Sequence, residues 1–168
     1  MNRAASAPEA SDPRLVAMRT THLDAVMRIE VASYPVPWTR GNFIDSLAGG
    51  SLGYCLFDRA EEMLGYCVAM AGPDELHLLN LTVAAPARGR GHARLMLDHL
   101  VAIAIAGHAR QIWLEVRTSN QRALHVYRRF GFSAVGVRKA YYPAAPKDGT
   151  RAREDAIAMS LELPPGDR

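Results

Sequence analysis

The apolar positions of the chain fall into short runs and spaced stripes that polar breaks separate. Continuous apolar runs of about four to eight residues are typical of buried strands, and apolar residues three or four positions apart are typical of amphipathic helices. Strands are expected at residues 15–18, 52–57, 63–71, 75–83, 111–116, 133–141 and 156–161. Helices are expected after residue 21, after residue 39, before residue 107 and after residue 120. This order predicts a mixed α/β fold.

Polar caps and glycines predict where two of these helices begin and end. Thr21, with Asp24 three residues later, has the spacing of a capping box at the start of the first helix. Asn120 is the expected cap of the last helix, and Gly131 its expected end. Phe132 then occupies the position of the hydrophobic contact in a Schellman motif.

The length of 168 residues suits one domain, which can bury about two-thirds of the surface of its unfolded chain. Residues 14–163 are expected to form this single domain. Residues 1–13 have no apolar stretch and are expected to be a disordered leader, with residues 164–168 as a tail. No apolar run approaches the ~18 residues of a membrane helix, so no membrane partner is expected.

Charge and cysteine content narrow the classes of partner and the compartment. The net charge of +3 is small for a nucleic-acid-binding surface, so no direct nucleic-acid contact is expected, whereas a small anionic ligand remains compatible. Cys55 and Cys67 lie inside apolar runs. They are interpreted as buried free thiols, which indicates a reducing cytoplasm.

The segment NLTVAAPARGRGHARLML joins an apolar strand to an amphipathic helix through an Arg-Gly-Arg-Gly sequence. The start of a helix offers unpaired N–H groups and a partial positive charge, which together bind phosphate. Small residues let a phosphate approach the backbone, and arginines add charge-assisted hydrogen bonds. The candidate phosphate-binding residues are Arg88, Gly89, Arg90, Gly91, His92, Ala93 and Arg94. The alternative is an arginine-rich turn that begins an exposed helix.

Two familiar phosphate-binding loops do not fit this segment. A Walker loop requires a lysine, and none is present; a dinucleotide fingerprint requires a third glycine where Arg94 stands. The remaining pattern, Arg88-x-x-Gly91-x-Ala93, resembles the Gln/Arg-x-x-Gly-x-Gly/Ala signature of the GCN-five-related N-acetyltransferases (GNAT). The resemblance implies the acyl-CoA N-acyltransferase fold, in which helices flank a mixed, mostly antiparallel central sheet. It also implies acetyl-CoA as the acetyl donor, with its pyrophosphate on this segment.

Further matches resemble the RimI-like branch of that family, whose members acetylate the N-terminal alanine of a small-subunit ribosomal protein. The matching segments are residues 37–39, 113–117, 119–120, 123–132, 141–143 and 153–156. The resemblance implies a cytoplasmic enzyme, expected to be a monomer, that transfers acetyl directly within a ternary complex. Residues 144–152 are longer than in the usual pattern, which leaves the exact acceptor open. The alternatives are another protein N-terminus, a small amine or, remotely, a non-enzymatic RNA-binding domain.

Amide formation from a thioester needs a deprotonated amine, and an α-amino group has a pKa of about 7.7–8.0. Glu115 is the candidate general base, since burial in its apolar strand would raise its pKa. The alternative is a strand-end glutamate paired with an arginine. Tyr127 is the candidate general acid for the leaving thiolate, because its ordinary pKa lies close to that of a thiol. The alternative is a tyrosine that only packs in the core.

The resemblance also implies the remaining contacts. Leu81, Thr82 and Val83 are expected to bind the pantetheine arm and the thioester carbonyl through their backbones, on a strand that splays from its neighbour. Asn120 is a further candidate contact, although capping alone explains it. The tentative acceptor-binding residues are Trp38, Tyr141 and Tyr142, which are equally compatible with packing at the rim. No metal is expected, because His92 and His99 are two helical turns apart.

Overall fold

The computed structural model describes residues 13–146, 148–150 and 152–165. The expected leader therefore lies outside the described residues except for residue 13, and the expected tail except for residues 164 and 165. The elements are β1 (Arg14–Ala17), η1 (Thr20–His22), α1 (Leu23–Ser33), α2 (Arg40–Ala48), β2 (Leu52–Phe57), β3 (Met63–Gly72), β4 (Glu75–Val83), η2 (Ala85–Ala87), α3 (His92–Ala106), β5 (Gln111–Arg117), α4 (Gln121–Phe130), β6 (Ser133–Pro143) and β7 (Arg153–Glu162).

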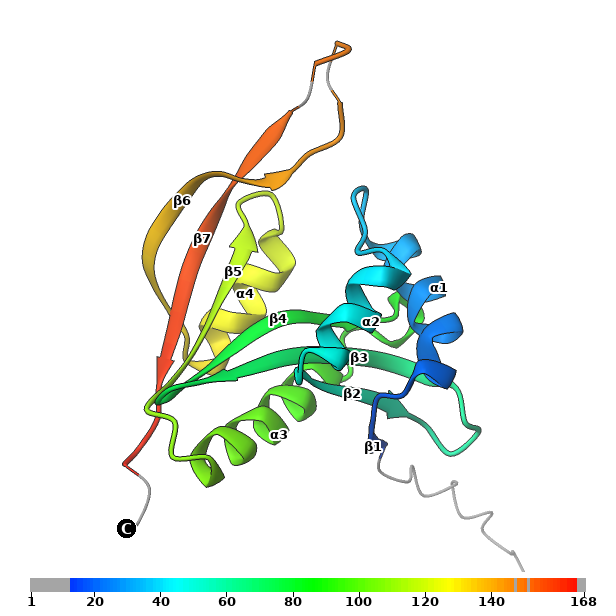
Figure 1. Cartoon of the computed structure of the whole chain (residues 1–168), viewed down its shortest axis with the longest axis vertical. Helices are drawn as coiled ribbons and strands as arrows, with labels where there is room; N and C mark the ends of the chain where they lie inside the picture. Colours follow the sequence, from blue (N-terminus) through cyan, green and yellow to red (C-terminus); the bar gives the residue numbers. More distant parts are fainter. Residues whose placement is uncertain (1–12, 147, 151, 166–168) are drawn as a thin grey trace, which may run out of the picture.

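The described strands form one seven-stranded sheet in the order β1-β2-β3-β4-β5-β7-β6 (Figure 1). Every neighbouring pair is antiparallel except β4 and β5. The parallel pair follows from the helix between them, because α3 carries the chain back across the sheet before β5 begins. The predicted mixed, mostly antiparallel sheet flanked by helices is confirmed.

Two hydrophobic clusters cover opposite faces of the sheet. Along β3, Cys67 and Ala69 join the cluster of α3 and α4, whereas Tyr66 and Val68 join the cluster of α1 and α2. Because successive side chains of a strand point to opposite faces, the two helix pairs cover different sides. None of the helices in the described part of the chain is long and apolar enough to cross a membrane.

One extra residue interrupts the pairing of β3 with β4. Val68 lies opposite Asn80 and Ala69 lies opposite Leu78, so Leu79 has no partner residue on β3. This β-bulge reverses the alternation of side chains along β4. As a result, Asn80 faces the same side of the sheet as Val68, toward α1.

The predicted start and end of α4 are confirmed, whereas the predicted start of α1 is wrong. Asn120 Oδ1 accepts a hydrogen bond from Ala123 N at 3.1 Å, and Phe132 N donates to Tyr127 O at 3.0 Å, as the Schellman motif requires. The capping box at Thr21 is a misassignment, because residues 20–22 form a short 3-10 turn and α1 begins only at Leu23. The 3-10 turn uses Thr21 inside its hydrogen-bonded ring, so this residue is not at a helix boundary.

Candidate active site

The parallel strands β4 and β5 share only a short ladder and then separate. Pairing runs from Glu75 with Gln111 to Leu78 with Leu114, while β4 continues to Val83 and β5 to Arg117. Figure 1 shows the two strands leaving this shared segment in different directions. Beyond the ladder, the edge of β4 that faces β5 has backbone groups available to a ligand.

A cavity of about 410 Å³ lies at this separation. Its walls include Leu78–Leu81 of β4 and Leu114–Arg117 of β5, together with residues from both sides of the sheet. Glu30 and Trp38 contribute from the α1 side, and Tyr127 contributes from α4 on the other side. The cavity therefore connects the two faces of the sheet, and its size suits a small-molecule site.

Glu115 lines this cavity from β5 with a side chain that is only 4% exposed. Its Oε2 lies 2.7 Å from His77 Nε2, and its Oε1 lies 3.3 Å from Arg138 Nε. Oε1 has no hydrogen-bond partner among the described residues, although it is buried. The carboxylate thus has a charged arginine nearby, as the alternative interpretation expects, and it also has an oxygen that can still accept a hydrogen bond.

The aromatic side chains of β4 and β5 fix the surroundings of Glu115. The rings of His77 and Trp113 stack with centroids 3.6 Å apart and an interplanar angle of 7°. The guanidinium of Arg138 lies 5.5 Å from the ring of Trp113. Sequence reasoning missed His77, because its contact with Glu115 depends on the parallel register of two strands that are far apart in sequence.

Tyr127 lines the cavity from α4 and is 7% exposed. It packs edge-on against Phe132, with ring centroids 5.6 Å apart. Burial raises the pKa of Tyr127, and the neighbouring Tyr34 raises it further. The phenol therefore stays protonated over the physiological range and can donate a proton, but its pKa is further from that of a thiol than the ordinary tyrosine value suggests.

A second carboxylate, Glu30 of α1, holds the cavity wall together. It is 1% exposed and accepts hydrogen bonds from Trp38 N at 2.8 Å, from Asn80 Nδ2 at 3.2 Å and from the hydroxyl of Tyr66. These contacts attach the segment after α1 to the sheet and orient Trp38 at the cavity. Sequence reasoning did not identify Glu30, because its donors come from three separate parts of the chain.

The Arg-Gly segment forms a turn that ends at the first residue of α3. Gly89 has φ +76° and Gly91 has φ +84°, both in the left-handed region that favours glycine. The first hydrogen bond of the helix joins Leu95 N to Gly91 O at 3.1 Å, so the N–H groups of the preceding turn have no partner within the helix. A Cβ at Gly89 or Gly91 would meet nothing within 4 Å, so backbone conformation, not internal crowding, requires these glycines.

The arginines of this segment have different surroundings. Arg88 is directed inward, where Nε donates to Val83 O at 3.0 Å and Nη2 to Ser33 Oγ at 3.4 Å. Arg94 lies 3.7 Å from Asp98 in an exposed pair. Burial lowers the pKa of His92, and the charge of Arg90 lowers it further. The side chain of Arg88 therefore secures the turn to β4 and α1.

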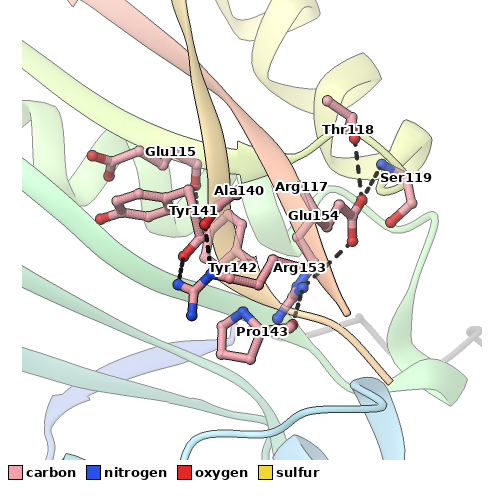
Figure 2. A network of polar contacts seen from close by, with 10 residues as sticks. All are labelled: Glu115, Arg117, Thr118, Ser119, Ala140, Tyr141, Tyr142, Pro143, Arg153 and Glu154. Atoms are coloured by element: carbon pink, nitrogen blue, oxygen red, sulfur yellow. Dashed lines mark hydrogen bonds and ion pairs between the residues drawn. The ribbon is translucent and has the colours of Figure 1, made fainter. Parts of the chain in front are cut away.

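The end of β6 is shaped by an irregularity that β7 holds in place. Ala140 has φ +47°, and its N donates to Asp155 Oδ1 at 2.8 Å. Arg153 donates to the carbonyls of Ala140 and Tyr141, at 2.6 Å and 2.8 Å (Figure 2). Tyr142 follows the irregularity and donates its hydroxyl to the main-chain oxygen of Glu115 at 2.8 Å. The β6–β7 pair thus positions both tyrosines beside β5.

The loop after β5 is tied to β7 by Glu154. Its carboxylate accepts hydrogen bonds from Ser119 N at 2.7 Å and Thr118 Oγ1 at 3.2 Å, and it lies 3.4 Å from Arg117 Nη1 (Figure 2). Arg117 also lies 4.5 Å from the ring of Tyr142. This network connects the loop that precedes Asn120 to the tyrosine wall of the cavity.

The predicted site residues divide between the cavity and its surroundings. The cavity lining includes Trp38, Leu81, Glu115, Asn120, Tyr127 and Tyr142. The lining does not include Tyr141, Thr82, Val83 or residues 88–94. Tyr141 is 37% exposed and packs edge-on against Tyr142 at 4.9 Å. Among the described residues, no group of three or more His, Cys, Asp or Glu side chains is arranged to hold a metal ion.

Comparisons with known proteins agree with this geometry. The family model described as "Acetyltransferase (GNAT) family" matches residues 23–132. The chain is 31% identical over 146 residues to the [ribosomal protein bS18]-alanine N-acetyltransferase of Escherichia coli, covering 87% of this chain and 95% of that protein. The enzyme of the same name from Haemophilus ducreyi is 31% identical over 82% of this chain and 92% of its own. The crystal structure of the Escherichia coli ribosomal-protein-S18-alanine N-acetyltransferase superposes with a TM-score of 0.79 at 30% identity, covering 90% of this chain and 94% of that one.

Proposed function

Since the chain belongs to the acetyltransferase (GNAT) family, we propose that it transfers acetyl from acetyl-CoA to an N-terminal alanine of ribosomal protein bS18. Acetyltransferases of this family use acetyl-CoA as the donor. The acceptor is proposed because curated relatives with that printed activity match this chain over nearly their whole length.

The observation that carries the proposal is the cavity between β4 and β5, which reaches both faces of the sheet. An amine that enters from the side of Trp38 and Glu115 would meet a thioester that enters from the side of Tyr127. This arrangement supports direct transfer, because neither substrate has to leave before the other arrives. Positioning of two reactants in this way supplies a large part of the rate enhancement.

The cysteines offer no route through an acetylated enzyme. Cys55 and Cys67 are both 0% exposed, and burial raises the pKa of each thiol to about 12. Almost none of either residue is thiolate at neutral pH, and only the thiolate is a good nucleophile. This supports a ternary complex and fits our proposal of a cytoplasmic enzyme with free thiols.

We assign the chemical steps to two side chains. Glu115 accepts a proton from the ammonium group, and the freed lone pair attacks the thioester carbonyl. The carbon–sulfur bond then breaks, and Tyr127 protonates the leaving thiolate. The nitrogen loses its second proton as the amide forms, which restores the phenol of Tyr127, and Glu115 releases its proton to solvent; the products are the amide, free coenzyme A and one proton. The carboxylate is supported as the base by its position in the cavity wall and by its Oε1, which has no hydrogen-bond partner among the described residues.

The remaining residues are proposed to bind the two substrates. The backbones of Leu81, Thr82 and Val83 bind the pantetheine arm along the free edge of β4. The turn that precedes α3 holds the pyrophosphate, with Asn120 as a further contact. Trp38, Tyr141 and Tyr142 border the acceptor peptide. We further propose that residues 14–163 form one domain, that the protein is a monomer and that it does not bind nucleic acid directly.

The test is acetylation of a peptide with the N-terminal sequence of bS18, followed by mass spectrometry. The full chain and acetyl-CoA should add one acetyl group, and fragmentation should locate it on the α-amine of the first alanine. A peptide with a blocked N-terminus is the matched control and should remain unmodified. Acetylation of only small amines such as polyamines, or of lysine side chains alone, would contradict the proposed acceptor.

A further inference from the structure

His77 contacts the carboxylate of Glu115 and has no part in the roles assigned above. The hydrogen bond joins His77 Nε2 to Glu115 Oε2 at 2.7 Å. The two side chains are only 12% and 4% exposed, so water competes weakly for either group. A hydrogen bond to an ionised carboxylate in such surroundings is stronger than one between neutral groups.

The ring of His77 is held in place by its strand and its neighbour. His77 pairs in register with Trp113, one rung before the parallel ladder ends at Leu78 and Leu114. Glu115 is two residues beyond Trp113 on β5, on the same face of the sheet. The stack at 3.6 Å and 7° restricts the plane of the imidazole. The donor is therefore preorganised before any substrate binds.

The two oxygens of Glu115 differ in what they can still do. Oε2 is engaged by His77, whereas Oε1 has no hydrogen-bond partner among the described residues. The titratable and charged groups that face the carboxylate are His77 from β4 and Arg138, Tyr141 and Tyr142 from β6. Arg138 lies 3.3 Å from Oε1 and Tyr141 also contacts the carboxylate, whereas His77 is the group that hydrogen-bonds to Oε2.

We propose that His77 is a positioning residue for the general base: its Nε2–H holds Oε2 of Glu115 and leaves Oε1 to accept the proton of the incoming amine. This inference rests on the proposed role of Glu115. It has a consequence for pH dependence, because a donor to the ionised form of a carboxyl favours that form. Without the donor, the ionised carboxylate loses a stabilising contact, so the acidic limb of the activity profile should move to higher pH.

Two substitutions of His77 test the N–H donor and the aromatic ring separately. His77→Phe keeps an aromatic ring against Trp113 but has no N–H, whereas His77→Gln keeps an N–H donor but loses the stack. We expect His77→Phe to lower kcat by about 10-fold, with KM for acetyl-CoA unchanged and the acidic limb of kcat/KM displaced to higher pH. We expect His77→Gln to stay within about 3-fold of the unmodified protein, with its acidic limb unmoved. The proposal would be overturned if His77→Phe had the kcat and the acidic limb of the unmodified protein, or if both variants lost the same fraction of kcat.

A measurement without an acceptor distinguishes this inference from the proposed function. The carboxyl carbon of Glu115, assigned through Glu115→Gln, is titrated by ¹³C NMR in the unmodified protein and in folded His77→Phe. We expect a midpoint at higher pH in the variant. An unmoved midpoint would overturn the role of His77 whichever amine is acetylated. If the midpoint moves but the bS18 peptide is not acetylated, only the proposed acceptor is overturned.

Discussion

Glu30 and Glu115 both line the cavity, but their carboxylates are held in different ways. Glu30 has both oxygens engaged: Oε1 by Trp38 N, and Oε2 by Tyr66 and Asn80. Glu115 has Oε2 engaged by His77 and Oε1 without a hydrogen bond among the described residues. A carboxylate whose acceptors are fully used stabilises the fold, whereas a half-used one can take a proton from a substrate.

Burial alone does not separate the two roles. Glu30 is 1% exposed and the Glu115 side chain 4% exposed, so either would qualify as a buried acid. The neighbouring groups differ in kind. Glu30 accepts hydrogen bonds from neutral N–H and O–H groups, whereas Glu115 lies beside an imidazole, His77, and a guanidinium, Arg138. The distinction follows from the hydrogen-bond inventory of each oxygen, and substitutions of each carboxylate can test it.

The largest effect is expected for Glu115→Gln. The amide cannot accept the ammonium proton, so kcat should fall by about 100-fold or more. Affinity for acetyl-CoA, measured by calorimetry, should change little, and so should the midpoint of thermal unfolding. Turnover equal to that of the unmodified protein would remove Glu115 from the mechanism and leave it as a structural ion-pair partner.

Tyr127→Phe extends the comparison to the other face of the sheet. The ring remains to pack against Phe132, but the proton donor for the thiolate is lost, so kcat should fall by about 100-fold. Steady-state kinetics at saturating acetyl-CoA will measure the change, with circular dichroism as the control for folding. A variant with unchanged turnover would assign Tyr127 to the core alone.

Glu30→Gln should lower stability more than chemistry. The amide has one acceptor oxygen where the carboxylate has two, so at least one buried donor loses its partner. The free energy of unfolding should fall by about 1–3 kcal/mol, as measured by urea denaturation. Turnover per folded molecule should fall less than in Glu115→Gln. Full stability with a 100-fold lower kcat would reverse the assignment of the two carboxylates.

The smallest effect is expected for the more exposed carboxylate of Glu154. Burial raises the pKa of Glu154, but hydrogen bonds from Ser119, Arg117 and Thr118 outweigh it and hold the pKa below its ordinary value of 4.5. The folded pKa is therefore depressed, and the stabilisation is present above the ordinary value and is lost as the pH falls through the folded value.

Glu154→Gln should remove this pH-dependent contribution. The loss of stability at neutral pH should be within about 1 kcal/mol, as for other accessible pairs. Thermal unfolding of both proteins from neutral pH to pH values below 4.5 is the measurement, and the two curves should converge as the pH falls. Curves that stay parallel would show that Glu154 does not titrate in this range.

Features that depend on residues close together in the sequence were predictable. Asn120 marks the start of α4 and Gly131 its end, as expected, because capping needs only residues within one turn. The Arg-Gly turn was identified for the same reason. Thr21 shows the limit of local patterns, since a 3-10 turn with similar composition occupies the expected start of α1.

Features that depend on strand register were not predictable. The contact of His77 with Glu115 requires β4 and β5 to pair in one particular parallel register. The three donors to Glu30 come from the segment before α2, from β3 and from β4. The inward direction of Arg88 likewise depends on Ser33 of α1. A single sequence contains no information on these pairings until the fold has brought the elements together.

The extra residue Leu79 decides which face of the sheet the later residues of β4 meet. Its deletion would restore regular alternation with a period of two. Asn80 would then follow Leu78 directly and keep Val68 as its partner, so Asn80 and Thr82 would still face α1 and Leu81 would still face the cluster of α3. Regular pairing with Leu79 retained would instead place Leu79 opposite Val68 and turn every later side chain of the strand to the other face. The strand should therefore tolerate the deletion of Leu79 better than a regular register that includes it.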